Sequence, residues 1–417
     1  MTNIRRVLLD SNEWWKGEFE LEYHKRDILE HVSKFISLPQ IIAFTGLRRV
    51  GKTTLMFRIA SDFIGSGFDS KNIIYFSFDD FRDAHVSEVI RVYEELMGKN
   101  FKEGKYLLLL DEIQKLENWE DQVKRIYDIY GKHVKIILSG SESLFLRKKS
   151  KETLSGRIFE FKVDTLSFKE FLRFKETEFQ PIELYEKELA GLFQQFIQTQ
   201  GFPELVGIDD REIILKYIRE SIIEKIVYRD ISHLFKVRDL GVLDSLLKII
   251  IDRPGQIIDI SDLATELMVS RQTVSNYLMY LQESFLVRKL YNYSTNRRKT
   301  ERKLKKYYPT LLLGKVFEQD DLSRSRVFEW LMVNQLKAEY FWRDSYKHEV
   351  DVVIANDKVV PVEIKAGKIE TKGLVTFMEK FGVDKGYIVT PDREERLEVK
   401  GKVIEVVKGF KFLMQRP

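Results

Sequence analysis

One run of eight residues has the types and spacing needed to bind a phosphate. Gly46, Gly51, Lys52 and Thr53 occupy the fixed positions of the pattern Gly-x-x-x-x-Gly-Lys-Ser/Thr. In such a loop backbone amides surround the phosphates, the lysine contacts the β- and γ-phosphates, and the hydroxyl ligates Mg²⁺. An apolar run precedes it and helical spacing follows it, which favours a nucleotide site over a plain glycine turn. The expected nucleotide-binding residues are Gly46, Leu47, Arg48, Arg49, Val50, Gly51, Lys52, Thr53 and Thr54.

A pair of carboxylates, Asp111 and Glu112, ends the apolar run at residues 106–110. A strand buried on both faces has no reason to end in two charges unless its end lines a cleft. We predict that Asp111 holds Mg²⁺ and that Glu112 accepts a proton from the water that attacks the γ-phosphate. The alternative is a strand that exits into solvent, and the phosphate loop upstream makes it the weaker interpretation.

Apolar runs alternate with segments of helical spacing through the first part of the chain. The runs are at residues 41–45, 73–78, 106–110 and 134–139, and the helical segments include 86–97 and 119–130. Continuously apolar strands that alternate with helices predict a parallel sheet covered on both faces.

Four segments of this region resemble the AAA+ superfamily, in the archaeal and bacterial branch related to signal-transduction ATPases. They are residues 46–54, Leu-Leu-Leu-Leu-Asp-Glu-Ile-Gln at 107–114, Leu-Ser-Gly-Ser at 138–141 and Leu-Ser-Gly-Arg at 154–157. The resemblance implies that Ser139 or Ser141 contacts the γ-phosphate or the attacking water, and that Arg157 is an arginine finger. A surface salt bridge is an equally weighted interpretation of Arg157. A finger supplied in trans would require a homo-oligomer.

The pattern of apolar residues in the sequence changes after residue 165. Residues 166–238 have apolar positions three and four apart and resemble the small helical lid of the same ATPases. Residues 239–300 predict three helices, at 240–252, 260–267 and 271–281, followed by a wing from Phe285. A short helix, a turn and a longer helix with a polar face is typical of a winged helix-turn-helix.

We predict that this module contacts DNA. Nine basic residues and one acid, Glu301, lie in the span 288–306, a footprint typical of a nucleic-acid backbone partner. The alternative is a packing or protein-docking module with a solvated basic loop. The candidate DNA-binding residues are Arg271, Gln272, Thr273, Ser275, Asn276, Arg297, Arg298 and Lys299.

The last segment, residues 301–417, resembles the PD-(D/E)XK nuclease core. The matching residues are Glu329 on an expected helix at 325–340, Asp351 on a strand, and Glu363 and Lys365 on its hairpin partner. Glu363 and Lys365 share a face because side chains alternate along a strand. The resemblance implies that Asp351 and Glu363 bind Mg²⁺ or Mn²⁺, that Glu329 binds through water or a second ion, and that Lys365 promotes hydroxide formation.

Two observations leave the nuclease activity open. Hairpins of alternating charge are common, and this fold has many inactive descendants. Relatives also usually carry an Asp-Thr-Gly-Leu-like segment where residues 307–314 read Tyr-Tyr-Pro-Thr-Leu-Leu-Leu-Gly.

Composition limits the classes of protein. A chain of 417 residues suggests two to four domains, and its net charge of +4 is too small to name a partner. The absence of cysteine excludes disulfides and thiolate metal sites and favours a reducing compartment. The first residues have no apolar core typical of a signal peptide, and no apolar run reaches the ~20 residues of a membrane span. We therefore expect a cytoplasmic protein without a membrane partner.

Together these features predict an α/β protein with four parts. They are a P-loop NTPase parallel sheet (1–165), a helical lid (166–238), a winged helix-turn-helix (239–300) and an α/β restriction-endonuclease-like domain (301–417). The expected function is a Mg²⁺-dependent ATPase that couples ATP hydrolysis to DNA binding or processing, with nuclease activity left open. The alternative is an ATP-gated switch or scaffold whose inactive nuclease-like domain binds a protein partner.

Overall fold

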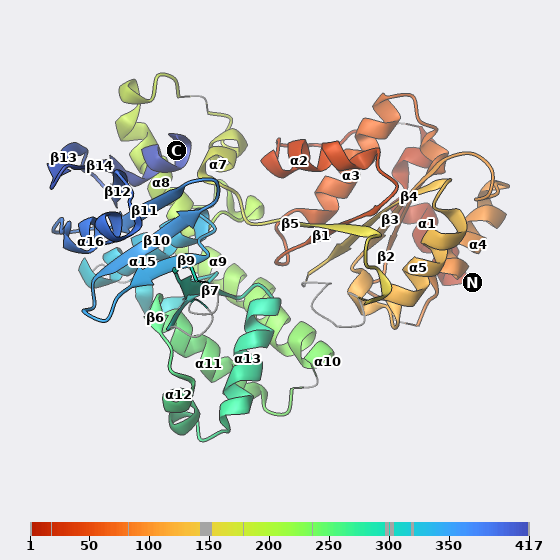
Figure 1. Cartoon of the computed structure of the whole chain (residues 1–417). Coiled ribbons are helices and arrows are strands. Elements are labelled where there is room, and N and C mark those ends of the chain that lie inside the picture. Colours follow the sequence, from red (N-terminus) through yellow and green to blue (C-terminus); the bar gives the residue numbers. More distant parts are fainter. Residues whose placement is uncertain are drawn as a thin grey trace. The chain divides into compact units, whose positions relative to one another are not determined.

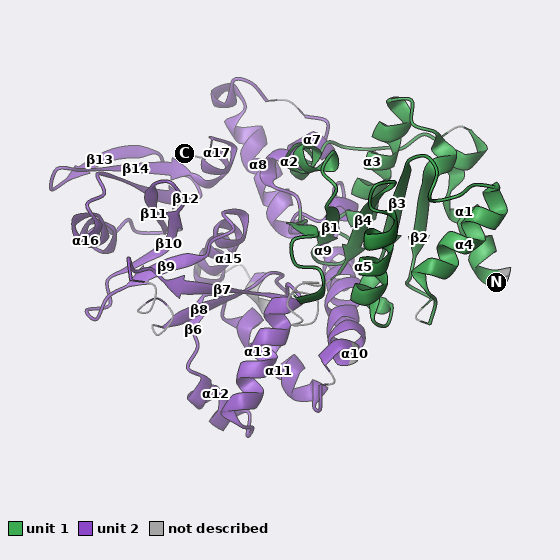
Figure 2. Ribbon diagram, turned by 45° about the vertical axis from the view of Figure 1, so that its right-hand side comes forward, with its two compact units in different colours: residues 1–165 green, residues 166–417 purple. Residues whose placement is uncertain are grey.

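The computed structural model describes residues 2–17, 19–81, 83–141, 152–177, 179–235, 237–296, 300, 304–317 and 321–415. The chain divides into two compact units, residues 1–165 and 166–417 (Figure 2). Among the described residues, no helix has both the length and the apolar character needed to cross a lipid bilayer.

Unit 1 is built on a five-stranded sheet whose strands all run parallel (Figure 1). Its strands, in the spatial order β2-β3-β4-β1-β5, are β2 (Ile73–Ser77), β3 (Tyr106–Asp111), β4 (Val134–Gly140), β1 (Ile41–Thr45) and β5 (Ile158–Lys162). Its helices are α1 (Thr2–Ser11), α2 (Asp27–Ile36), α3 (Lys52–Gly65), α4 (Val86–Met97) and α5 (Trp119–Tyr130). Strands β1 and β3 are buried at every position, as their continuous apolar runs predict for a sheet covered on both faces.

Strand β5 was not predicted, because an edge strand lacks a continuous apolar run. Of its five residues only Phe161 is buried. The lead-in before β1 covers the opposite edge of the sheet. The Asn12 side chain donates to Tyr75 O at 3.0 Å and accepts from Tyr75 N–H at 2.7 Å, so it pairs with the edge of β2. Both Trp14 and Trp15 donate their indole N–H to Ile73 O.

Unit 2 is a nine-stranded mixed sheet with helices around it (Figure 1). Its strands, in the spatial order β13-β14-β12-β11-β10-β9-β7-β8-β6, are β13 (Glu395–Val399), β14 (Lys402–Lys408), β12 (Lys385–Thr390), β11 (Val359–Ile364), β10 (Glu349–Ala355), β9 (Tyr340–Arg343), β7 (Val287–Asn292), β8 (Lys305–Pro309) and β6 (Gln256–Ile257). The helices are α7 (Phe168–Phe174), α8 (Glu186–Thr199), α9 (Arg211–Lys216), α10 (Ser232–Phe235), α11 (Leu240–Asp252), α12 (Ile260–Glu266), α13 (Arg271–Glu283), α15 (Asp321–Gln335), α16 (Lys372–Phe381) and α17 (Gly409–Gln415), with π-helical segments at Tyr217–Ile223 and Lys225–Ile231.

The three parts that the sequence separates within 166–417 share one hydrophobic core, and the last two also share one sheet. Strand β7, expected in the wing, pairs in parallel with β9 through Tyr291 and Tyr340. Helices α7 and α8, expected in the lid, contribute Phe171 and Phe196 to the same hydrophobic core as Leu331 of α15. Residues 166–417 therefore form one compact unit.

Helix α15 differs from its prediction. A helix was expected at 325–340, but α15 ends at Gln335 and Tyr340–Arg343 form strand β9. Lys337 has a positive φ of 53°, which breaks the helical path. Phe341 and Trp342, which follow the expected helix, are fully or almost fully buried in strand β9.

Candidate functional site

The phosphate-loop residues form a tight turn between the end of β1 and the start of α3. Gly46 and Gly51 have φ values of +142° and +93°, which L-residues with a side chain rarely adopt. A Cβ on Gly46 would lie 2.1 Å from Val163 O, so a larger residue there has no space. Lys52 is buried, and its ammonium donates to Gly46 O at 3.1 Å and Leu47 O at 2.7 Å. The turn therefore keeps the lysine head within the loop.

Asp111 is the centre of a hydrogen-bonded cluster at the carboxyl end of β3. Its Oδ2 accepts from Thr53 Oγ1 at 2.6 Å and from the Tyr75 hydroxyl at 2.9 Å. Its Oδ1 accepts from the Ser139 hydroxyl and from Glu112 N–H. Strand β4 lies between β1 and β3 in the sheet, which brings Ser139 to this carboxylate. The hydroxyl of Thr53 and the Asp111 carboxylate are hard oxygen donors, so they fit Mg²⁺.

Glu112 is positioned by two further side chains. It has a positive φ of 52°, uncommon for a residue with a side chain. Gln114 Nε2 donates to Glu112 Oε2 at 2.5 Å and to Ser141 Oγ at 3.1 Å. Of the two serines weighed for the γ-phosphate contact, Ser139 therefore binds Asp111, whereas Ser141 orients the glutamine that holds Glu112.

Sequence reasoning missed three residues of this site: Arg26, Tyr75 and Gln114. Burial and the nearby Asp111 carboxylate raise the pKa of Tyr75, so its hydroxyl stays protonated and donates. Arg26 is buried, and its two terminal nitrogens donate to Val50 O and Asp164 O, each at 2.8 Å. Gln114 belongs to the segment 107–114 and could have been noticed there, but no local pattern marks Arg26.

Arg157 does not take part in the nucleotide site of its own chain. It directly precedes β5, whose first residue, Ile158, pairs with Ile41 at the start of β1. The phosphate loop follows the other end of β1, so Arg157 lies at the opposite end of the sheet. Its Nε donates to Asp128 Oδ1 at 3.2 Å, which is the salt-bridge interpretation of this residue. As an arginine finger it could act only on another chain.

The predicted DNA-binding residues of α13 lie at its N-terminal end. Arg271, Gln272 and Ser275 are exposed, and the opposite face of the helix is buried. Thr273 and Asn276 are half-buried, and Asn276 accepts from Gln272 at 2.8 Å. The three remaining candidates, Arg297, Arg298 and Lys299, lie outside the described residues.

The basic span at 288–306 is not one continuous surface. Arg288 donates to Asn334 Oδ1 at 3.2 Å, and the ammonium of Lys289 lies over the ring of Tyr291. Lys306 is buried and forms ion pairs inside unit 2. Lys306 therefore adds nothing to an exposed basic surface, because β8 directs its side chain into the fold.

The nuclease-like residues converge from α15, β10 and β11. Asp351 and Glu363 are buried on neighbouring antiparallel strands, and Asp351 Oδ2 accepts from Ile364 N–H at 2.8 Å. Lys365 lies 2.7 Å from Glu363 Oε1. Glu329 Oε1 accepts from the Tyr308 hydroxyl at 2.6 Å.

Crowding of carboxylates dominates the electrostatics of this cluster. Burial and the neighbouring Asp351 raise the pKa of Glu363 to about 8. The same two causes raise the pKa of Glu329. Although burial opposes it, Asp351 and Glu363 raise the pKa of Lys365. The cluster therefore has an excess of negative charge when its acids are ionised.

Glu329, expected to bind through water or a second ion, does not join Asp351 and Glu363 in a three-carboxylate metal site. Among the described residues, no three His, Cys, Asp or Glu side chains are arranged to hold a metal ion. Glu329 is engaged by Tyr308 and lies 3.7 Å from the Lys306 ammonium. In contrast, Glu363 Oε2 is buried and has no hydrogen-bond partner in the described structure, so a donor set of Asp351 and Glu363 fits one cation.

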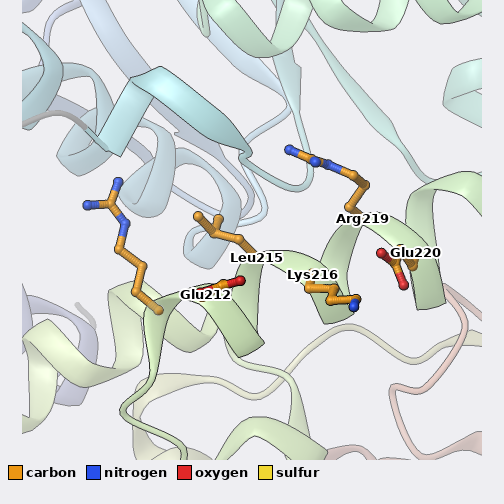
Figure 3. A pocket seen from close by; sticks show the side chains of 6 residues that line it. Glu212, Leu215, Lys216, Arg219 and Glu220 are labelled. Atoms are coloured by element: carbon orange, nitrogen blue, oxygen red, sulfur yellow. The ribbon is translucent and has the colours of Figure 1, made fainter.

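One further hollow lies in unit 2 along α9 and the start of the π-helical region (Figure 3). None of the predicted site residues lines it. The side chains that do are Arg211, Glu212, Leu215, Lys216, Arg219 and Glu220.

Three segments of the chain match protein-family models. Residues 38–172 match a model described as an AAA domain, and residues 191–310 and 325–408 match two models described as domains of unknown function. A solved structure titled as a DNA replication initiation factor covers 62% of this chain and 86% of its own at 18% identity, with a TM-score of 0.28. A likeness of that level supports no argument about this chain.

Three relatives are uncharacterised proteins. MJ1544 of Methanocaldococcus jannaschii is 32% identical over 60% of this chain, and a Haemophilus influenzae protein is 29% identical over 64%. The match spans 56% and 66% of these two relatives' own lengths. MJ1637 of M. jannaschii is 26% identical and is matched over 99% of this chain and 93% of its own. The AAA match and the parallel sheet support an AAA-type ATPase domain in the first part of the chain.

Proposed function

We propose that the protein is a Mg²⁺-dependent ATPase that couples ATP hydrolysis to DNA binding or processing. The contact of 2.6 Å between Thr53 and Asp111, beside the phosphate loop, is the observation that carries the ATPase assignment. This contact brings the phosphate loop and the carboxyl end of β3 together, which binding of a Mg²⁺–triphosphate requires. When bound, the ion would neutralise charge on the phosphates, and Thr53 and Asp111 would hold it.

Each remaining residue has a role in this site. When a triphosphate binds, the Lys52 ammonium gives up its hydrogen bonds to Gly46 O and Leu47 O and contacts phosphate oxygens instead. Glu112 orients the attacking water and accepts its proton. Gln114 keeps the Glu112 carboxylate in place, and Ser139 holds Asp111.

A turnover assay with two variants tests the ATPase. Lys52→Ala and Glu112→Gln should each lower the ATP hydrolysis rate by roughly 100-fold or more. Glu112→Gln should still bind ATP, because it changes the water and not the phosphate contacts. Lys102→Ala, at an exposed lysine of unit 1, is the matched control and should be unaffected. Unchanged hydrolysis in Lys52→Ala would exclude this loop as the active site.

DNA binding is proposed for the segment α11 to β8. Its order of helix, strand, helix, helix and two strands is that of a winged helix, and Arg271, Gln272 and Ser275 are exposed at the start of α13. Arg271→Ala should weaken DNA binding and lower the salt dependence of affinity by about one ion. Arg396→Ala, at an exposed arginine on β13, should not. Binding that is independent of salt would favour the protein-docking alternative.

A second candidate activity is phosphodiester hydrolysis at the C-terminal carboxylates. The buried, unpartnered Glu363 Oε2 beside Asp351 favours it, since a Mg²⁺ or Mn²⁺ ion would supply the missing charge. Lys365, 2.7 Å from Glu363, would then stabilise a hydroxide. Asp351→Asn should abolish Mn²⁺-dependent cleavage, whereas Asp357→Asn in the turn of the same hairpin should not. If both variants match a wild type that cuts nothing, the ATP-gated scaffold that binds a protein partner is favoured.

A further inference from the structure

The ammonium of Lys306 lies among three carboxylates of the C-terminal cluster. Its Nζ is 2.5 Å from Glu349 Oε1, 3.7 Å from Glu329 Oε1 and 3.8 Å from Asp351 Oδ1. The Lys306 side chain is only 6% exposed. A buried ammonium is costly unless carboxylates surround it, so these contacts hold the charge where it lies.

Strand β8 places this lysine by simple alternation. Lys306 and Tyr308 point to one face of the strand, and Lys305 and Tyr307 point to the other. The two residues on the first face contact the same carboxylate, Glu329. The Lys306 ammonium also lies 5.5 Å from the centre of the Phe341 ring. Because β8 is an inner strand of the sheet, with β7 and β6 on its two sides, the backbone fixes the position of the ammonium.

The charges of the cluster are unevenly satisfied. On the Lys306 side, Glu329 also accepts from Tyr308 at 2.6 Å, and Glu349 also lies 3.3 Å from Arg343. On the other side, Glu363 Oε2 is buried without a hydrogen-bond partner among the described residues. On the Lys306 side an ammonium therefore lies among the carboxylates, whereas on the other side Lys365 pairs with Glu363 Oε1 at 2.7 Å and only Oε2 is left without a partner among the described residues.

We propose that the Lys306 ammonium is a fixed internal cation that fills one of two cation positions in the cluster and limits it to one divalent ion, held by Asp351 and Glu363. This inference rests on the metal site proposed above and goes beyond it in two respects. It assigns Glu329 to the ammonium and not to a metal, and it makes Lys306 the residue that determines the metal stoichiometry.

The competing explanation is that Lys306 is only a structural ion pair at the edge of a metal site that includes Glu329. The two explanations differ in what Glu329 does. If Lys306 fills the second cation position, replacing Glu329 changes the metal affinity only in a chain that lacks the Lys306 ammonium. If Glu329 is a metal ligand, replacing it lowers the metal affinity in the chain that keeps Lys306.

Mn²⁺ titration of the full-length chain, followed by the electron paramagnetic resonance signal of free Mn²⁺, distinguishes them. Every variant also carries Asp111→Asn, which removes metal binding at the nucleotide site. The parent should bind one Mn²⁺, Asp351→Asn should bind none, and Glu329→Gln should change the affinity by less than about threefold. Lys306→Met should gain a second Mn²⁺ or bind the first at least tenfold tighter, and adding Glu329→Gln should remove that gain. Lys306→Arg keeps the charge and should show no gain.

Four results would overturn the inference. A tenfold loss of affinity in Glu329→Gln would make Glu329 a ligand, and this variant keeps the side-chain shape even if Lys306→Met fails to fold. Two Asp351-dependent ions in the parent, or no change in folded Lys306→Met, would remove the role of Lys306 and leave the metal site standing. If no variant shows Mn²⁺ binding that depends on Asp351, the proposed C-terminal metal site is wrong as well. The ATPase assignment is unaffected by that result.

Discussion

Replacing Arg26 by methionine tests whether a residue outside every motif positions the phosphate loop. The guanidinium donates to Val50 O and Asp164 O, each at 2.8 Å, and Arg26 is 5% exposed. Methionine keeps most of the apolar stem and removes both donors. It also leaves two carbonyl groups without this partner.

The expected loss follows from these contacts. A hydrogen bond from a charged donor contributes about 1.5–3 kcal/mol net, so the loss of two should lower the free energy of unfolding of unit 1 by about 3–6 kcal/mol. Val50 lies two residues before Lys52, so the loop should also become more mobile. We expect the KM for ATP to rise at least tenfold, with a smaller change in kcat, because the loop binds the phosphates in both the ground state and the transition state.

Hydrogen exchange of the peptide covering residues 46–54, calorimetric ATP binding and steady-state kinetics measure these effects. Arg91→Met is the matched control, because the ion pairs of Arg91 with Glu88 and Glu95 lie at the surface, so the change should alter stability by less than about 1 kcal/mol. Arg26→Lys, whose single ammonium replaces the forked guanidinium, should recover part of the effect. Unchanged exchange and ATP affinity in Arg26→Met would refute the positioning role.

Three further predictions concern single side chains. Tyr75→Phe removes one donor to Asp111 and should lower kcat for ATP by about three- to tenfold with little change in the ATP dissociation constant; an unchanged kcat at saturating Mg²⁺ would contradict this. Gln114→Ala frees Glu112 and should lower kcat by roughly tenfold, measured in single turnover, while ATP binding is retained. The pKa of Glu363 is raised from 4.5 to about 8 in the folded chain, so the folded state binds the proton more tightly. The free energy of unfolding of unit 2 should therefore fall as the pH rises from about 4.5 to about 8. Glu363→Gln should flatten that part of the pH profile in urea titrations without divalent metal, and an unchanged profile would exclude Glu363 as the titrating group.

Local patterns predicted much of the fold. Helices α4, α5 and α11 have the expected bounds, and the hairpin of β10 and β11 lies where alternating side chains placed it. Strand β5 has no apolar run of its own, and β9 was not predicted beyond its first residue, Tyr340, which the expected helix at 325–340 included. Residues 166–417 form one compact unit, and the parallel pairing of β7 with β9 inside it has no local signal.

The sequence by itself determined the phosphate loop and the Asp111–Glu112 pair, because each is a contiguous segment whose own residues create its geometry. It also placed Asp351, Glu363 and Lys365 together, because a hairpin and a period of two require it. Tertiary structure alone decided what surrounds these groups. Arg26 meets the carbonyl of Asp164, 138 positions away in the chain, and Lys306 meets Glu349 across strands that are not neighbours in the sheet. Contacts between distant segments depend on how strands are ordered and which faces are buried, and no local spacing records either.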